Sequence, residues 1–206
     1  MKKALLISII VNFFVFPIHS QEWIYSSKIN GSNVDPKFSR IDDQNNVIVL
    51  SSFTDSIYSP FDFISRGLPD LFLLKYNQFG DILWSKHIGS SGYDAGGGIA
   101  IDLDNNIYIS GNFNNICYFT ENDSLQSKAK VDIFLAKYDP AGVLQWVKRI
   151  GTSTETQFSM DLSFNNSDRL LMTGFFRDSC HGLTICFRIS ISFIRASSTN
   201  RSIAVL

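Results

Sequence analysis

The sequence carries almost no net charge. Its 206 residues include 18 lysines and arginines against 19 aspartates and glutamates, a formal net charge of −1. A nucleic-acid site needs a clear excess of basic side chains to neutralise phosphates. The composition therefore argues against nucleic acid as a partner, and it gives enough apolar residues for one large or two small globular domains.

Cysteine is also scarce, with three residues in the chain. An odd number cannot pair completely within one chain. Cys117 lies in the strand-like stretch NNICYF, which favours a small apolar core residue. Cys180 and Cys186 lie close together near the C-terminus, and whether they form a disulfide depends on geometry that the sequence does not provide.

Long apolar runs are absent after the first twenty residues, so the sequence predicts no transmembrane helix there. Residues 1–20 have a basic start, an apolar run from Ala4 to Phe16 and a polar exit. That pattern predicts a signal peptide, although an uncleaved anchor or a buried strand would share its apolar run. We expect the mature chain to begin near Gln21 and to be secreted or held at the cell surface.

Aromatic and turn-forming residues are abundant. Aromatic residues make up 14% of the chain, including 18 phenylalanines. Together with valine, isoleucine and many Asn, Gly and Ser turns, this composition favours β structure. The N-terminal segment is the only helical candidate.

An internal repeat dominates the chain. Trp23, Trp84 and Trp146 are spaced 61 and 62 residues apart. Around the last two, DLFLLKYNQFGDILWSKHIGSSG from Asp70 matches DIFLAKYDPAGVLQWVKRIGTST from Asp132. RIDDQNNVIVLSSF likewise matches AIDLDNNIYISGNF, with a degenerate third copy from Asp161. Several registers sharing one period of about 60 residues indicate a repeat architecture.

Each unit reads as strands and turns. In the second unit we expect four strands, 71–76, 81–88, 98–102 and 107–113, with a two-residue hairpin turn at Asn105 and Asn106. Four antiparallel strands in about 60 residues predict one β-propeller blade. The excess residues, Asp55–Pro69 and Asn114–Lys130, are expected to form a long loop or an extra hairpin. The sequence thus predicts an all-β fold of about three blades in an incomplete or open propeller, over residues 21–178.

The repeat resembles the bacterial β-propeller repeat known as the SBBP repeat, which is common in exported proteins of Bacteroidetes-type bacteria. The resemblance covers roughly Glu22 to Asp178. It implies a propeller blade and no particular activity, because the family is defined by its blade. The matching residues are Asp132, Phe134, Lys137, Tyr138, Gly142, Trp146, Gly98, Ile99, Ala100, Asp102, Tyr108 and Gly111.

The pattern stops after Asp178. By its period, the next Asp-x-Phe-x-x-Lys-Tyr strand should begin near residue 194, where the sequence reads IRASSTNRSIAVL. Residues 179–206 contain no Asp, Glu, Lys or Pro. We interpret this tail as an altered or truncated reading frame, the alternative being a divergent final strand followed by a tail.

Candidate metal and acid–base residues follow the repeat. Asp102 and Asp104 resemble the start of a calcium loop, but the sixth and twelfth positions hold Ile107 and Phe113 instead of glycine and an acidic residue. Asp42 and its neighbours form the earlier copy. Hairpin turns with side chains bonded to the backbone are therefore expected at both places. Asp70 and Asp132 recur with the period, so we expect them to hold turns and not to catalyse a reaction.

Other chemistry-bearing residues do not form a recognisable motif. His19, His87 and His181 share no ligand spacing, and no nucleophile elbow is present. Gly96–Gly98 precedes a strand with no helix after it, which argues against a phosphate-binding loop. The repeated Lys-Tyr and Trp positions could form a sugar-binding ledge, but regularly repeated aromatics favour a core between blades.

The sequence therefore predicts no catalytic, cofactor-binding or metal-binding residues, and no cofactor. We expect a non-enzymatic exported scaffold that binds protein or glycan through loops on one face. Self-association through open blade edges is expected as well. The alternatives are a fragment of a larger propeller enzyme, such as a lyase or hydrolase, or a truncated gene product without a function of its own.

Overall fold

The protein is described here by a computed structural model that covers residues 29–31, 33–150, 156–165, 168–176 and 192–195. These residues form strands and turns, with no helix among them, as the sequence predicts. No helix within these ranges is long and apolar enough to cross a membrane. The strands are β1 (Asn30–Gly31), β2 (Asp35–Ile41), β3 (Val47–Phe53), β4 (Ser56–Ser59), β5 (Phe63–Ile64), β6 (Asp70–Tyr76), β7 (Ile82–Ile88), β8 (Ala95–Ile101), β9 (Ile107–Phe113), β10 (Ile116–Tyr118), β11 (Ser124–Gln126), β12 (Asp132–Tyr138), β13 (Leu144–Ile150), β14 (Gln157–Phe164), β15 (Arg169–Phe176) and β16 (Ser192–Arg195).

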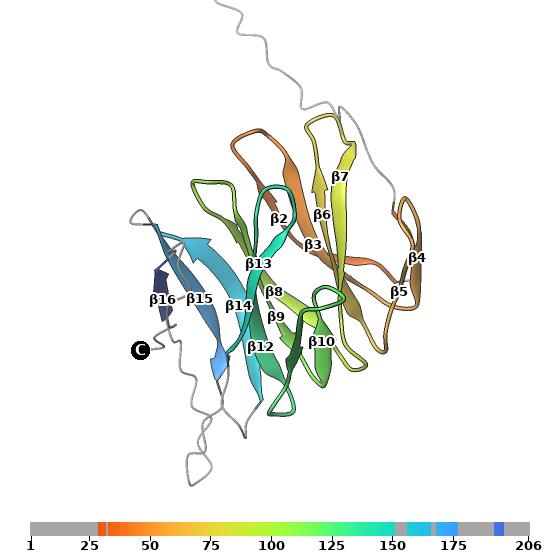
Figure 1. The fold of residues 1–206 in the computed structure, drawn as a ribbon, viewed down its shortest axis with the longest axis vertical. Helices are drawn as coiled ribbons and strands as arrows, with labels where there is room; N and C mark the ends of the chain where they lie inside the picture. Colours follow the sequence, from red (N-terminus) through yellow and green to blue (C-terminus); the bar gives the residue numbers. More distant parts are fainter. Residues whose placement is uncertain (1–28, 32, 151–155, 166–167, 177–191, 196–206) are drawn as a thin grey trace, which may run out of the picture.

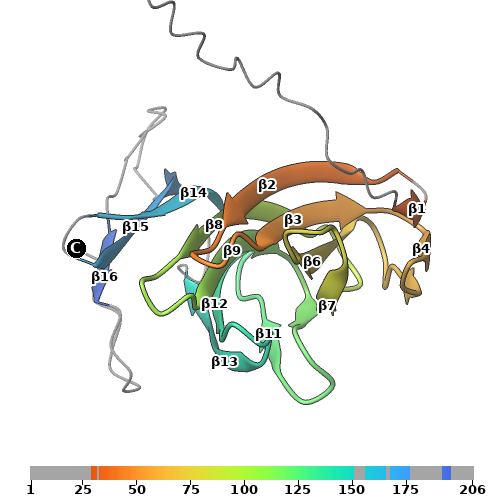
Figure 2. The ribbon, with the colours of Figure 1, turned by 90° about the horizontal axis from the view of Figure 1, so that it is seen from above.

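Three antiparallel sheets form the body of the protein. The first blade has the order β2-β3-β6-β7, the second β8-β9-β12-β13, and the third β14-β15-β16. The sheets stand side by side (Figure 1) and fan out along an arc when seen from above (Figure 2). The described residues therefore form an open array of propeller blades, in agreement with the predicted fold class.

The predicted boundaries of a blade are wrong. We expected β6, β7, β8 and β9 to share one sheet, because they follow one another in the sequence repeat. Instead β9 pairs with β12 in full register, Phe113 opposite Asp132 and Ile107 opposite Tyr138. The link from β7 to β8 passes from the first blade to the second. One sequence repeat therefore contains the last two strands of one blade and the first two strands of the next. The reason is that hydrogen bonding joins the strands on either side of each long excess segment, such as β9 and β12.

Each excess segment folds into a small hairpin, one of the two alternatives that the sequence left open. Between β9 and β12, β10 pairs with β11. Between β3 and β6, β4 pairs with β5 and also with the short strand β1. The β10–β11 hairpin lies at the end of the blade opposite the β8–β9 and β12–β13 turns (Figure 1). The blades thus have a short-turn face and an insertion face.

The core lies between the blades. Successive residues of β6 are all buried, because Leu71 and Leu73 face the second blade while Phe72 and Leu74 face the β4–β5 hairpin. Cys117 and Phe119 of the second insertion fill the space between the first two blades, so the core role predicted for Cys117 is confirmed. A separate cluster joins the second and third blades; it consists of Ala100, Tyr108, Ile133, Leu135, Ile150, Leu162, Leu170 and Met172.

Two glycines of β8, Gly97 and Gly98, allow the third blade to approach closely. A Cβ atom on Gly97 would lie 2.5 Å from Ser159 Oγ, and one on Gly98 would lie 2.6 Å from the backbone nitrogen of Leu162. The glycine run is therefore a packing feature of a strand, as the absence of a following helix indicated. Asn112 completes this contact by accepting a hydrogen bond of 2.7 Å from the Ser159 backbone N–H.

The predicted tail contributes one described strand. β16 pairs with β15, with Arg195 opposite Arg169, and so takes the place that β6 and β12 hold in the other blades. It lies where the repeat period places that strand, but it has four residues instead of seven. The backbone at 192–195 therefore fits the alternative of a divergent strand. The described residues do not include the predicted signal peptide (1–20), Trp23, His19, His181, Cys180, Cys186 or the remainder of 179–206.

Candidate functional site

The two periodic aspartates, Asp70 and Asp132, hold the loops that precede their strands. Both carboxylates are buried, and each accepts a backbone N–H from four residues earlier, Arg66 at 3.0 Å and Lys128 at 2.7 Å. Asp70 also contacts His87 Nε2 at 2.6 Å. In the second blade Arg149 takes the place of this histidine, 3.0 Å from Asp132. The predicted turn-holding role of both aspartates is therefore confirmed.

The calcium-like segments are hairpin turns whose aspartates bind their own backbone. Asp102 Oδ1 accepts the N–H groups of Asp104 and Asn106 at 3.1 and 2.8 Å. Asp42 does the same for Gln44 and Asn46 at 2.9 and 2.8 Å. The turn is longer than the predicted two-residue type, since five residues separate the paired Ile101 and Ile107, and Asn105 has a positive φ of 61°. Asparagine tolerates this conformation better than most residues.

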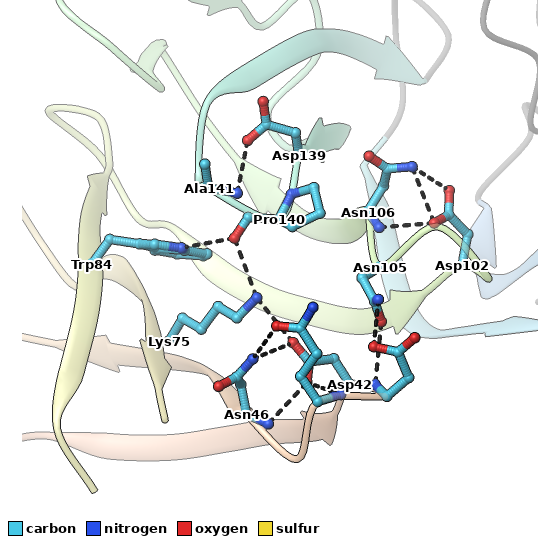
Figure 3. A network of polar contacts seen from close by, with 12 residues as sticks. Asp42, Asn46, Lys75, Trp84, Asp102, Asn105, Asn106, Asp139, Pro140 and Ala141 are labelled. Atoms are coloured by element: carbon cyan, nitrogen blue, oxygen red, sulfur yellow. Dashed lines mark hydrogen bonds and ion pairs between the residues drawn. The ribbon is translucent and has the colours of Figure 1, made fainter. Parts of the chain in front are cut away.

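A buried polar network connects the first blade with the second (Figure 3). Lys75 Nζ lies 2.9 Å from Asp42 Oδ2, and it also donates a hydrogen bond of 3.2 Å to the Pro140 carbonyl oxygen. Burial raises the pKa of Asp42, but the hydrogen bonds from Asn46 and Lys75 outweigh it and hold the pKa below its usual value. Trp84 Nε1 donates to the same Pro140 oxygen at 3.2 Å. One carbonyl of the second blade therefore receives two donors from the first.

The second blade contains a looser copy of this network. Lys137 Nζ lies 3.6 Å from Asp102 Oδ2, and the Tyr108 hydroxyl donates to the same carboxylate at 3.2 Å. Burial, followed by the charge of Asp102, raises the pKa of Tyr108. Because the network repeats with the blade, it is part of the blade architecture.

The repeated tryptophans are equivalent but incompletely buried. Trp84 lies opposite Lys75 and Trp146 lies opposite Lys137, as the repeat requires. Both are half-buried, because they lie on the outermost strand of their blade. Tyr76 and Tyr138 are buried, so the predicted core role holds for the tyrosines in full and for the tryptophans in part.

A cavity of about 370 Å³ opens on the insertion face, between the first blade and the β10–β11 hairpin. It is lined by Arg66, Ser91, Asn115, Ile116, Tyr118 and Gln126. Asn115 Nδ2 donates to Ser91 Oγ at 3.2 Å, which joins the hairpin to the loop between the two blades. Tyr118 and Gly89 exchange backbone hydrogen bonds of 2.9 and 3.2 Å across the same junction. The cavity therefore has walls that are fixed by backbone contacts.

The cavity contains one cation and one aromatic ring in contact. The Arg66 guanidinium lies over the Tyr118 ring, 5.5 Å from its centroid. In β10 the side chains alternate, with Ile116 and Tyr118 exposed and Cys117 buried. Such a combination of aromatic, amide and cationic groups in a concave site is typical of small-ligand binding.

Asp94 lies in the loop between β7 and β8, which also supplies Ser91 to the cavity, and it is the one strongly perturbed carboxyl group among the described residues. It is buried, and burial raises its pKa to about 7, although hydrogen bonds from Ser90 oppose the shift. Its Oδ2 accepts the Ser90 N–H at 2.6 Å, whereas its Oδ1 has no hydrogen-bond partner within the described residues. Asp94 breaks the repeat, since Thr156 holds the corresponding position in the next unit.

The structure does not bring the other sequence candidates together. No group of three or more His, Cys, Asp or Glu side chains within the described ranges could hold a metal ion. Sequence reasoning missed the residues that line the cavity. The available signal was that all of them except Ser91 lie in the two excess segments, which do not follow the repeat.

Comparison with known proteins supports the repeat assignment. Residues 83–115 match the SBBP family model, described as a beta-propeller repeat. An uncharacterised WD repeat-containing protein of Acanthamoeba polyphaga mimivirus is 25% identical over 142 residues, which are 66% of this chain and 10% of that relative. The chain thus spans about a tenth of the length of the curated relative it matches. The matched family segment begins in β7 and ends after β9, so it also straddles two blades.

Proposed function

We propose that this β-propeller repeat protein is an exported, non-enzymatic scaffold that binds glycan or protein through its insertion face. The observation that supports the proposal is the cavity built by Arg66, Tyr118 and the β10–β11 hairpin. Binding residues commonly lie on loops that a rigid scaffold positions. Here the hairpin is anchored in the core by Cys117 and Phe119, while Ile116, Tyr118 and Gln126 line the cavity.

The described carboxylates and the histidine favour a binding role over catalysis. The Asp70–His87 pair recurs as Asp132–Arg149, which is the behaviour of a structural contact. Asp94 departs from the repeat, but it is fully buried and its polar contacts are to Ser90. A general acid or base must reach its substrate, directly or through one water. Asp94 is buried and is not among the residues that line the cavity, which supports a structural role.

The test of the binding role compares the two faces of the protein. The purified chain is applied to a glycan array and to immobilised cell-surface proteins. Tyr118→Ala alters the insertion face, and Leu103→Ser serves as the control, because Leu103 is exposed on the β8–β9 turn at the opposite end. We expect Tyr118→Ala to lower binding and Leu103→Ser to leave it unchanged. Equal effects of both variants would contradict the proposal.

Export is proposed from the N-terminal pattern alone. Mass spectrometry of the secreted and surface fractions is expected to find a peptide that starts at or near Gln21. A protein found only in the cytoplasm with Met1 intact would contradict this part of the proposal.

Self-association through the open blade edges belongs to the same proposal, since unpaired strand edges favour pairing with another chain. Light scattering tests it.

A further inference from the structure

We infer that the cavity on the insertion face binds a sugar that bears a carboxylate, with Arg66 as the ligand of the carboxylate. This inference rests on the proposed binding function and adds the chemical class of the ligand. It depends on the position of Arg66, on the polar groups around it and on the state of the neighbouring strand edge.

Arg66 forms no ion pair among the described residues, although its charge acts on the buried Asp94 and lowers the pKa of that carboxyl group against the larger effect of burial. Its backbone N–H is fixed to Asp70 Oδ2 at 3.0 Å, and its guanidinium rests over the Tyr118 ring. The guanidinium forms no hydrogen bond or ion pair with any residue that the structure describes. A guanidinium presents a planar fork of N–H donors that matches a carboxylate in two-point contact. Stacking on Tyr118 restricts the side chain, which lowers the entropy lost on binding.

The remaining walls suit the hydroxyl groups of a sugar. Asn115, Gln126 and Ser91 provide amide and hydroxyl groups, each of which can donate and accept hydrogen bonds. Ile116 and the Tyr118 ring add apolar surface for the carbon face of a sugar ring. The volume of about 370 Å³ lies near the lower end of the range for small-ligand cavities, which suits one or two sugar units.

An acidic peptide is less well matched to this cavity than a sugar. An extended peptide gains most of its affinity by adding a strand to an exposed sheet edge. Beside the cavity, the edge of β10 at Tyr118 already pairs with Gly89 through two backbone hydrogen bonds. Its other edge pairs with β11. Neither edge of β10 is therefore open to an added strand, and the acidic peptide becomes an alternative outcome of the test.

The experiment measures binding of three short probes to the full chain by calorimetry. The probes are a galacturonate trisaccharide, its methyl ester and a glutamate-rich hexapeptide. Arg66→Gln is compared with Lys130→Gln, which removes the same charge from an exposed position that does not line the cavity. Asn115→Gly removes a cavity amide and retains the positive φ of 59° that this position requires.

We expect the trisaccharide acid to bind at least tenfold more tightly than its methyl ester. Arg66→Gln is expected to abolish that preference, Asn115→Gly to weaken both sugars, and Lys130→Gln to change neither. Equal affinity for acid and ester, or loss of binding by Lys130→Gln as well, would overturn the inference and leave the binding face intact. Binding of the peptide alone, lost in Arg66→Gln, would overturn the sugar class. If no probe binds, the acidic-sugar inference fails, and the array comparison of Tyr118→Ala with Leu103→Ser decides the proposed function separately.

Discussion

Lys75 and Asp42 form an ion pair of 2.9 Å in which the two side chains are only 4% and 1% exposed. Each partner has further hydrogen bonds, from Lys75 to Pro140 and from Asn46 to Asp42. A buried pair satisfied in this way is costly to break, because removal of one partner leaves the other charged and unpaired. The pair joins the third strand of the first blade to its first turn and to the neighbouring blade.

Lys75→Met is therefore expected to lower the free energy of unfolding by about 3–5 kcal/mol. Lys137→Met is the matched variant in the second blade, where the pair is longer, 3.6 Å, and the lysine side chain is 15% exposed. We expect a smaller loss there, because the pair is longer and its lysine is less buried, so the interaction that is removed is weaker. Urea unfolding of the two variants checks this order. Equal losses would show that burial does not decide the strength of the network.

Trp84→Phe tests the hydrogen bond between blades separately from ring packing. The variant keeps an aromatic ring but removes the Nε1–H that donates to Pro140. A loss of about 0.5–1.5 kcal/mol is expected. Trp146→Phe is the control, because within the described residues Trp146 has ring contacts and no hydrogen bond from Nε1. If both variants lose the same stability in thermal or urea unfolding, the hydrogen bond contributes nothing measurable.

Gly98→Ala tests the close approach of the second and third blades. The added methyl group would lie 2.6 Å from the backbone nitrogen of Leu162, and backbone cannot move aside cheaply. We expect a loss of about 1–3 kcal/mol, as for other overpacked sites. Gly96→Ala in the same strand would meet side chains only, Leu50 at 3.2 Å and Phe38 at 3.6 Å. Its loss, measured by the same unfolding assay, should be clearly smaller.

Asp94 is expected to make stability depend on pH. Its pKa is raised to about 7 in the folded state from 3.8, so the folded protein binds a proton that the unfolded chain has released between these values. The contribution to stability therefore grows as pH falls from about 7 towards 4, and it is absent above that window. Relative to Asp94→Asn, the wild type should gain on the order of 2 kcal/mol between pH 8 and pH 5.

The control for this measurement is Asp104→Asn, because Asp104 is an exposed carboxylate on the β8–β9 turn. Urea unfolding at both pH values, with differences taken from the wild type, cancels the titration of all other groups. A difference between wild type and Asp94→Asn that does not change with pH would show that Asp94 is ionised in the folded protein throughout.

The repeat made the fold predictable, and it also caused the main error. Lys75, Lys137, Tyr76 and Tyr138 recur with the blade, so their core positions follow from sequence alone. The first and last strand of a blade cannot be predicted in this way, because a periodic sequence has the same period whichever strand is taken as the first. Only the pairing of β9 with β12 fixes the phase, and that depends on backbone hydrogen bonds between segments separated by a long insertion.

The cavity could not be predicted from the sequence, because most of its residues lie outside the repeat. Arg66 lies in the insertion of the first blade, and Tyr118 and Gln126 lie in that of the second. Residues that do not recur carry no periodic signal, and their proximity depends on how two blades pack. Asp94 was missed likewise, since its perturbed pKa arises from burial behind the loop at Ser90.

The alternation of side chains along β10 places residues that pack in the core next to residues that are exposed, within one short hairpin. Changes at Cys117 are opposed by the packing of the first two blades, whereas Ile116 and Tyr118 point away from that packing. Recognition could thus diversify at the outward positions while stability is conserved at the inward one. The first blade carries a hairpin, β4–β5, at the equivalent place, so each of the first two blades presents an insertion whose outward side chains can change without altering the sheet that carries it.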